Sequence, residues 1–163
     1  MESKDNWQTP NIAVDYLLPF IPKKFYMVWE SACGDYHIKD YLAKNGYGVY
    51  ATDIIDGDDF FEYEPMFHYD AQITNPPYSL MDKWIKRSFE LDKPFALLLP
   101  LYALHSKTRC KLWRGKGIQV IIPPNRISFI KPPNKKPIKG DSSPWAAVWV
   151  TWKFEIENDI NYV

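Results

Sequence analysis

The chain alternates between short apolar runs and stretches in which apolar residues recur at helical spacing. The short runs predict buried β-strands, and the helical spacing predicts amphipathic helices. The predicted strands cover residues 27–29, 48–51, 71–74, 95–99, 119–122 and 146–152. The predicted helices begin near Pro10, pass through residues 38–42 and 80–89, and occupy residues 105–114. This alternation is typical of an α/β fold with right-handed crossovers, a mainly parallel sheet and helices on both faces.

The pattern changes after residue 122, where prolines become frequent. Proline does not continue a helix, so the last strand follows without an intervening one, and we expect an antiparallel hairpin at the C-terminal end of the sheet. The Pro- and Lys-rich stretch 131–140 predicts a long exposed loop. Ligands of such folds bind beyond the carboxyl ends of the strands, so we expect a site just after strand ends.

Length and composition indicate one soluble unit. With 163 residues, 46% of them hydrophobic, the chain can bury a substantial core. The length fits a single domain over residues 1–163, with no separate target-recognition domain. No apolar run approaches the roughly 20 residues that span a bilayer, and no signal peptide is recognisable, so we expect a cytoplasmic protein. Cys33 and Cys110 have no Cys or His neighbour at metal-ligand spacing, so we expect reduced thiols and no metal.

The formal net charge is zero, but the charges are unevenly distributed. Residues 93–140 contain 11 Lys and Arg and no Asp or Glu, whereas the first 92 residues carry the acidic excess. This segregation suits a protein that binds a neutral or cationic cofactor at one end and a phosphate backbone at the other. Scattered, solvated lysines are the alternative interpretation. The candidate contacts to nucleic acid are Lys107, Arg109, Lys111, Arg114, Lys135, Lys136 and Lys139.

The tetrad Asn75-Pro76-Pro77-Tyr78 directly follows a predicted strand and precedes a predicted helix. An aromatic amine shares its lone pair with the ring, so hydrogen bonds must localise that pair before the nitrogen attacks a sulfonium carbon. The Asn75 side-chain oxygen and the Pro76 carbonyl can each accept one N–H of such an amine. The prolines fix φ, and Tyr78 offers a flat face to a planar target. The tetrad predicts methyl transfer to an exocyclic amine; a Pro-Pro turn that only closes a strand is the alternative.

Two other strand ends carry residues suited to a cofactor. After the first strand, Ala32 and Gly34 let a ligand approach the backbone, and Glu30 or Asp35 can receive an ammonium group. A strand, a Gly-containing turn and a helix start are also common in proteins without such a ligand.

After the second strand, Asp53-Ile54 places a carboxylate where it can accept both hydroxyls of a ribose. Asp58-Asp59-Phe60-Phe61 then pairs a carboxylate with an aromatic ring, which can bind an adenine amino group and cover one ring face, and Asp59 and Phe60 are the residues chosen for this role. Singly, these residues also read as solvated turn acids or a core aromatic. Their order and their places at strand ends favour one shared site.

Together these motifs resemble the small amino-methyltransferases of phages and prophages, which are relatives of the DNA adenine methyltransferases. The resemblance covers nearly the whole chain. Besides the tetrad, residues 5–10 match the family's opening Asp-x-Trp-x-Thr-Pro, and residues 29–38 match its cofactor loop. It implies the class I, Rossmann-like methyltransferase fold, with a mostly parallel seven-stranded sheet, and S-adenosyl-L-methionine as cofactor. It also implies that Trp7, Thr9 and Pro10 fold over the methionine end of that cofactor; in isolation, Trp7 and Thr9 read equally as an anchoring aromatic and a helix cap.

Two residues depart from the family's cofactor loop. Ser31 stands where the family usually has Pro, and Tyr36 stands where it usually has a second Gly. The Tyr36 side chain either narrows the cofactor pocket or points away from it and stiffens the loop.

The tetrad indicates the chemistry more firmly than the substrate. Related enzymes that use it methylate adenine in DNA or RNA, guanine in RNA, or the glutamine amide of a protein. The basic segment favours nucleic acid, and the resemblance favours DNA, whose adenine would be flipped against Tyr78. An enzyme that acts on RNA or protein and a non-catalytic binding module are the alternatives. We expect a phage- or prophage-encoded monomer or weak dimer with a short or relaxed recognition sequence.

Overall fold

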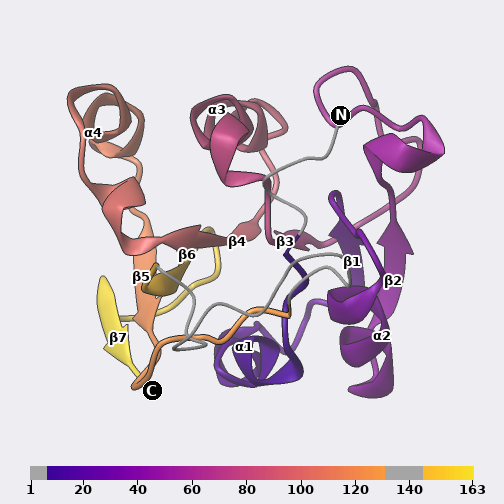
Figure 1. Ribbon diagram of the computed structural model, residues 1–163, viewed down its shortest axis with the longest axis horizontal. Coiled ribbons are helices and arrows are strands. Elements are labelled where there is room, and N and C mark those ends of the chain that lie inside the picture. Colours follow the sequence, from indigo (N-terminus) through magenta and orange to yellow (C-terminus); the bar gives the residue numbers. More distant parts are fainter. Residues whose placement is uncertain (1–6, 131–144) are drawn as a thin grey trace.

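The computed structural model describes residues 7–130 and 145–163. Its centre is a seven-stranded sheet with the strand order β2-β1-β3-β4-β6-β5-β7 (Figure 1). The strands are β1 (Met27–Glu30), β2 (Gly48–Ala51), β3 (Ala71–Thr74), β4 (Phe95–Pro100), β5 (Gln119–Ile122), β6 (Ala147–Trp152) and β7 (Ile160–Tyr162). The α-helices are α1 (Asn11–Asp15), α2 (His37–Lys44), α3 (Met81–Glu90) and α4 (Lys107–Trp113). Short 3-10 turns occupy Leu18–Phe20, Ile54–Asp56, Tyr78–Leu80 and Leu101–Leu104.

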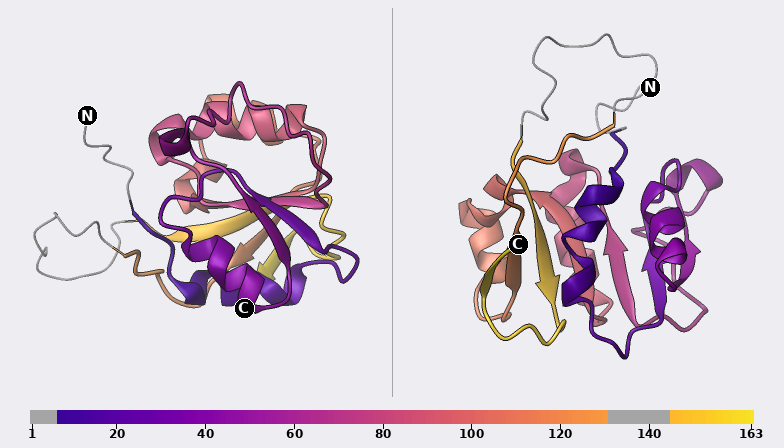
Figure 2. Two further views of the ribbon diagram at one scale, coloured as in Figure 1. Left: turned by 90° about the vertical axis from the view of Figure 1, so that its right-hand side faces the viewer. Right: turned by 90° about the horizontal axis from the view of Figure 1, so that it is seen from below.

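The helices cover both faces of the sheet. Helices α1 and α2 lie on one face, and α3 and α4 lie on the other (Figures 1 and 2). Each face has its own apolar core: one contains Val14 of α1 and Leu42 of α2, and the other contains Ile85 of α3 and Trp113 of α4. The fold is therefore a three-layer arrangement in which the sheet is buried on both sides.

Strand β4 illustrates how the sequence builds these two cores. All six of its residues are buried. Successive side chains of a strand point to opposite faces, and accordingly Leu98 belongs to one core, while Leu97 and Leu99 belong to the other. A strand that is covered on both faces of the sheet needs a continuous apolar run, and this run is the sequence pattern that predicts β4.

The strand directions confirm the predicted fold class. Strands β1, β2, β3 and β4 pair in parallel, whereas β6 runs antiparallel to both β4 and β5. The protein therefore has the expected α/β architecture, a mostly parallel seven-stranded sheet with an antiparallel C-terminal pair. Strand β1 has β2 on one side and β3 on the other, so the chain changes direction across the sheet at β1. In open α/β sheets such a switch point opens a crevice at the carboxyl ends of the strands.

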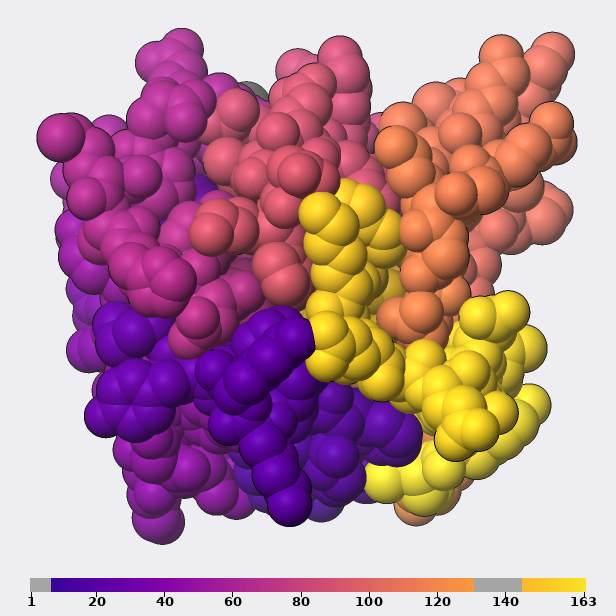
Figure 3. All heavy atoms as spheres, turned by 180° about the vertical axis from the view of Figure 1, so that it is seen from behind, coloured from indigo at the N-terminus to yellow at the C-terminus, as the bar shows by residue number. Residues whose placement is uncertain are grey.

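The N-terminal and C-terminal parts of the described chain lie side by side. The Trp149 indole N–H donates to the carbonyl oxygen of Ala13 at 2.7 Å, which fixes β6 to α1. From behind, the yellow C-terminal segment lies against the indigo N-terminal segment (Figure 3). Among the described residues, no helix is both long and apolar enough to cross a membrane.

The packing of β4 gives a prediction for stability. Leu97 is fully buried, whereas Leu101, four residues later, is 46% exposed. Leu97→Ala removes buried methyl groups and leaves a cavity, so it should lower the free energy of unfolding by about 2–5 kcal/mol. Leu101→Ala should lower it by much less. Urea denaturation followed by fluorescence measures both, and equal losses would show that β4 is not the centre of the core.

Candidate active site

A cavity with a volume of about 490 Å³ lies at the switch point. Its walls come from the segments that follow β1, β2 and β3, together with residues 7–9 at the N-terminal end of the described chain. This volume falls in the usual range for a small-molecule or cofactor site. The cavity therefore lies where a doubly wound sheet binds its ligand.

The loop after β1 is shaped by Gly34. Gly34 has φ +48°, a left-handed conformation, and a Cβ at this position would lie 2.8 Å from Gln8 Oε1. Only glycine fits here without moving its neighbour. The Gly34 N–H donates to Asp53 Oδ2 at 2.8 Å, so the end of β2 holds the loop in place. Ala32 and Gly34 both line the cavity, as the sequence predicts.

Glu30 is the most deeply buried carboxylate of the cavity, with 1% of its surface exposed. Burial raises the pKa of the Glu30 carboxyl well above its ordinary value, the Lys39 backbone N–H lowers it, and the Asp53 carboxylate raises it further. One oxygen, Oε2, has no hydrogen-bond partner in the described part of the chain. Of the two residues proposed for the ammonium group, Glu30 lines the cavity, whereas Asp35 is exposed and does not.

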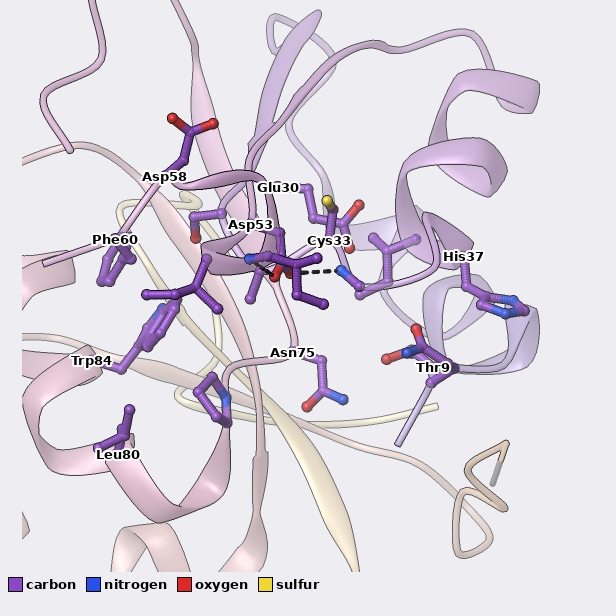
Figure 4. A pocket seen from close by; sticks show the side chains of 18 of the residues that line it. Thr9, Glu30, Cys33, His37, Asp53, Asp58, Phe60, Asn75, Leu80 and Trp84 are labelled. Atoms are coloured by element: carbon purple, nitrogen blue, oxygen red, sulfur yellow. Dashed lines mark hydrogen bonds between the residues drawn. The ribbon is translucent and has the colours of Figure 1, made fainter. Parts of the chain in front are cut away.

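Asp53 has a structural task besides lining the cavity. Its two oxygens accept the N–H groups of Gly34 and Ile55, at 2.8 and 3.0 Å. Each carboxylate oxygen can accept a second hydrogen bond, so the side chain can still receive a ribose hydroxyl. Ile54 follows Asp53 along the cavity wall and is 65% exposed. Figure 4 shows the Asp53 carboxylate in the middle of the cavity wall, close to Glu30 and Cys33.

Asp59 and Phe60 line the opposite end of the cavity. The Asp59 carboxylate accepts the Phe61 N–H at 3.0 Å. The Phe60 ring stacks on Trp84 with ring centres 4.1 Å apart and planes 10° apart, and Phe60 is 2% exposed (Figure 4). One face of Phe60 is therefore already covered by Trp84, whose indole Nε1 is buried with no hydrogen-bond partner within residues 7–130 and 145–163.

The cavity is electrically negative. Glu30, Asp53, Asp58 and Asp59 line it, and its described walls contain neither Lys nor Arg. Burial, followed by the nearby carboxylates of Glu30 and Asp53, raises the pKa of the Cys33 thiol to about 12. This polarity favours a ligand that carries positive charge.

Asn75 lies at the junction of this cavity with a second, smaller pocket of about 20 Å³. Its side-chain Oδ1 is buried and accepts no hydrogen bond from the described residues. In Figure 4, Asn75 lies between the Phe60–Trp84 pair and Thr9. The smaller pocket is lined by Trp7, Asn75, Pro76, Tyr78, Phe129 and Trp145. Tyr78 and Trp145 meet edge to face with ring centres 5.9 Å apart.

The prolines of the tetrad separate the two spaces. Pro76 lines the small pocket and Pro77 lines the large cavity. Pro77 has φ −61° and ψ 121°, and it precedes the 3-10 turn Tyr78–Leu80 that leads into α3. The tetrad thus directs Asn75, Pro76 and Tyr78 toward the small pocket while the chain turns into a helix. The structure brings all four predicted catalytic residues together at this boundary.

The N-terminal segment contributes two of its three predicted residues to the cavity. Trp7 borders both spaces and Thr9 lines the large cavity. Thr9 does not cap α1, because Pro10 occupies the N-cap position without a side-chain cap. Pro10 itself does not line the cavity, and its assignment to cofactor binding stays a prediction. With φ −73° and ψ 154°, Pro10 turns the chain from the cavity edge into α1.

The backbone conformation of Tyr36 determines its place at the start of α2. The residue has φ +63° and caps α2 in a left-handed conformation, which glycine adopts more readily than tyrosine. The Tyr36 side chain does not line the cavity. Its ring lies beneath Lys39 Nζ, 4.7 Å from the ring centre. The Tyr36 hydroxyl donates to Asp56 Oδ2 at 3.4 Å, so the side chain bridges the loop after β1 and the turn after β2 without lining the cavity.

The predicted nucleic-acid contacts divide into three groups. Lys107, Lys111 and Arg114 are exposed on α4 and at its end. The Arg109 guanidinium forms an ion pair with Asp82 at 3.0 Å and donates to the carbonyl of His105 at 2.8 Å. The contact with Asp82 joins α4 to α3, and the contact of Arg109 with nucleic acid stays a prediction. Lys135, Lys136 and Lys139 lie outside the described residues.

Several site residues were not predicted. Leu80 and Trp84 have the helical spacing of a core face, and nothing in that spacing indicates that they also line a cavity. Phe129 and Trp145 flank the basic loop and reach the small pocket only through the tertiary fold. The other missed residues are Gln8, Ser31, Cys33, His37, Ile38 and Ile55. The described residues contain no group of three or more His, Cys, Asp or Glu that could hold a metal ion.

Comparisons with known proteins report similarity of fold. No protein-family model matches the chain, and no curated protein matches its sequence. Among solved structures, a protein described as a methyltransferase from Thermoplasma acidophilum has a TM-score of 0.48 and 11% identity, over 88% of this chain and 73% of that one. A dimethyladenosine transferase from Plasmodium falciparum has a TM-score of 0.45 and 15% identity, over 90% of this chain and 62% of that one. A predicted O-methyltransferase from Agrobacterium tumefaciens has a TM-score of 0.44 and 12% identity, over 91% of this chain and 83% of that one. At these scores, function has to be argued from the site itself.

The buried carboxyl of Glu30 gives a prediction about stability and pH. An unfolded chain ionises this group near its ordinary pKa of 4.5, whereas the folded protein ionises it only at higher pH. The folded state therefore loses stability as the pH rises through that interval. Glu30→Gln removes the ionisation and keeps an oxygen that can accept the Lys39 N–H. It should raise the melting temperature of the ligand-free protein at neutral pH and leave it unchanged at pH 4.

Glu62→Gln serves as the control, because Glu62 is exposed. Thermal melts at pH 4 and pH 7.5 measure both variants. Destabilisation by Glu30→Gln at neutral pH would show that a partner already satisfies the charged form of Glu30.

Proposed function

We propose that the protein transfers a methyl group from S-adenosylmethionine to the exocyclic amino group of adenine in DNA. The observation that carries this proposal is the position of Asn75, whose buried Oδ1 has no partner in the described chain and faces the junction of the two spaces. A buried acceptor without a donor is costly, so such a group needs an explanation, and a ligand that donates to it is one. An incoming N–H donor would satisfy it.

The large cavity fits the proposed cofactor in size and charge. S-adenosylmethionine carries positive charge on its sulfonium and ammonium groups, and its methyl group is the one to be transferred. The unpaired Oε2 of Glu30 can accept the ammonium N–H, and the second lone pairs of Asp53 can accept ribose hydroxyls. Ile54 and the Phe60–Trp84 pair supply the apolar surface that an adenine ring requires.

The tetrad then acts on the amine. Asn75 Oδ1 accepts one N–H of the target, and the Pro76 carbonyl is the second acceptor in this proposal. With both protons engaged, the nitrogen lone pair is withdrawn from the ring and directed toward the cofactor side of Asn75. The chemistry is mostly positioning, because the two proline φ angles are fixed before the target arrives.

The small pocket supports a planar, aromatic target. Four of its six lining residues are aromatic: Trp7, Tyr78, Phe129 and Trp145. Such walls stack on a nucleobase, whereas a glutamine amide would gain little from them. The pocket volume of about 20 Å³ holds roughly one water, so the aromatic side chains must separate when a base enters.

The charge distribution supports a nucleic acid as the carrier of that base. The turn and helix from His105 to Lys116 contain no acidic residue, and Lys107, Lys111, Arg114 and Lys116 are exposed there. Exposed lysines on one helix suit a phosphate backbone, and the acidic cavity suits the cofactor. Only the resemblance favours DNA over RNA. RNA, a protein glutamine or no transfer at all are the other outcomes of the experiment below.

Removal of Asn75 tests the proposed reaction. Asn75→Ala deletes one of the two acceptors, so methyl transfer should fall by about 100- to 1,000-fold. S-adenosylhomocysteine binding, which does not need the acceptor amine, should change little. The assay incubates labelled S-adenosylmethionine with unmethylated DNA, bulk tRNA or a cell extract, and it measures label in each pool. The wild type should label DNA.

Asn161→Ala is the matched control, because Asn161 lies on β7 and its side chain donates to the Asn158 carbonyl, away from both spaces. This variant should keep full activity. Label in RNA or protein but not in DNA would replace the proposed substrate. Tight cofactor binding without any transfer would indicate a binding module.

The basic helix gives a second test. Lys107→Ala combined with Lys111→Ala should weaken DNA binding at every sequence and lower the slope of log affinity against log salt by about 1 to 2. S-adenosylhomocysteine affinity should not change. Titrations at several salt concentrations measure the slope, and Lys23→Ala combined with Lys44→Ala, on exposed lysines away from α4, provides the control. An unaltered slope would remove α4 from the DNA surface.

A further inference from the structure

Residues 7–9 separate the large cavity from the small pocket. Trp7 lines both spaces, while Gln8 and Thr9 line the large one. The segment is neither a helix nor part of the seven-stranded sheet. Its position is therefore determined by its own contacts.

Gln8 supplies two of these contacts in opposite directions. Its side-chain Oε1 accepts the Asp35 N–H at 3.1 Å, and its amide group fills the space beside Gly34 where a Cβ would lie. Its backbone pairs with Ile130 in an isolated antiparallel bridge: each N–H donates to the other residue's carbonyl at 2.9 Å. Gln8 itself is 9% exposed.

The two contacts of Gln8 reach the walls of two different spaces. Gly34 belongs to the loop that lines the large cavity, whereas Phe129, next to Ile130, lines the small pocket. Phe129 is also buried in the core below the sheet, so the segment it belongs to is held at that end. A continuous set of contacts therefore runs from the Gly34–Asp35 loop to the Gln8 side chain, and from the Gln8 backbone through Ile130 to the wall of the small pocket, which we call the acceptor pocket.

We propose that Gln8 is a positioning residue that couples the two sites, so that a ligand in the large cavity makes the wall of the acceptor pocket more rigid. The inference rests on the proposed function for the identity of the ligands. A ligand that orders the Gly34–Asp35 backbone also fixes the Gln8 side chain. The Gln8–Ile130 bridge then opens less often, and Phe129 is held where the base must stack. By linkage, an acceptor in the small pocket raises the affinity for the cofactor by the same factor.

Hydrogen exchange tests the coupling without any methyl transfer. The experiment adds S-adenosylhomocysteine to the whole protein and follows the amides of Asp35, Phe129 and Ile130. In the wild type, exchange at Ile130 should slow by about five-fold or more, the lower end of typical coupling between sites. In Gln8→Ala, Asp35 should remain protected by the ligand, while exchange at Ile130 should no longer respond.

A second variant cuts the same path at its other end. Ile130→Pro removes the N–H that donates to Gln8 and leaves the Gln8 side chain unchanged. S-adenosylhomocysteine should bind it with wild-type affinity, but the added protection at Phe129 should disappear. Gln119→Ala replaces a glutamine on β5 that lines neither space and should behave as the wild type.

The outcomes distinguish the coupling from the proposed function. If S-adenosylhomocysteine binds and Ile130 is not protected in the wild type, or is protected equally in Gln8→Ala, the coupling is wrong and the proposed function stands. If S-adenosylhomocysteine does not bind the wild type, the proposed function fails and the coupling fails with it. Loss of cofactor affinity in Gln8→Ala with normal protection at Ile130 would assign Gln8 a purely local role in the loop.

Discussion

The site depends on the parallel pairing of β1 with β2 on one side and β3 on the other. Parallel strands end at the same edge of a sheet, so the segments after Glu30, Ala51 and Thr74 meet although they are far apart in sequence. The Asp53 carboxylate then fixes this meeting point, because it receives N–H groups from Gly34 and Ile55. One side chain thus ties two strand ends together, and the cavity, the junction at Asn75 and the acceptor pocket are all positioned relative to them.

Much of this framework could be predicted from the sequence, because buried strands need apolar runs and the tetrad has a recognisable composition. The six predicted strands and four predicted helices are confirmed, with small changes at their ends. Strand β7 was missed for a physical reason: Ile160 and Tyr162 are exposed at the edge of the sheet, and only Asn161 between them is buried. An edge strand of this kind has no apolar run. Thr9 was equally readable as a cap, since nothing local distinguishes a cap from a cavity wall.

The residues and contacts that sequence reasoning missed depend on the tertiary fold. Arginine is a residue type that often binds phosphate, and Arg109 lies in a basic run. The fold brings Asp82 within 3.0 Å of its guanidinium, and a basic run alone does not reveal such a partner. Phe129 and Trp145 lie far from the tetrad in sequence and reach Tyr78 only in the folded chain. Gln8 lies between Trp7 and Thr9, and nothing in its local sequence indicates a role, so only the structure shows that it contacts both a loop and a distant backbone.

The reversed direction of β6 has a consequence for how such a protein can change. Because β5 is antiparallel to β6, the chain leaves β5 at Ile122 and enters β6 at Ala147 on the same edge of the sheet, beside the acceptor pocket. The connecting segment carries Phe129 and Trp145 near its two ends. A segment attached in this way can be exchanged or lengthened without shifting either strand. Under the proposed function, replacing Phe129 or Trp145 would change the walls of the small pocket, while the strand ends that line the large cavity would keep their positions.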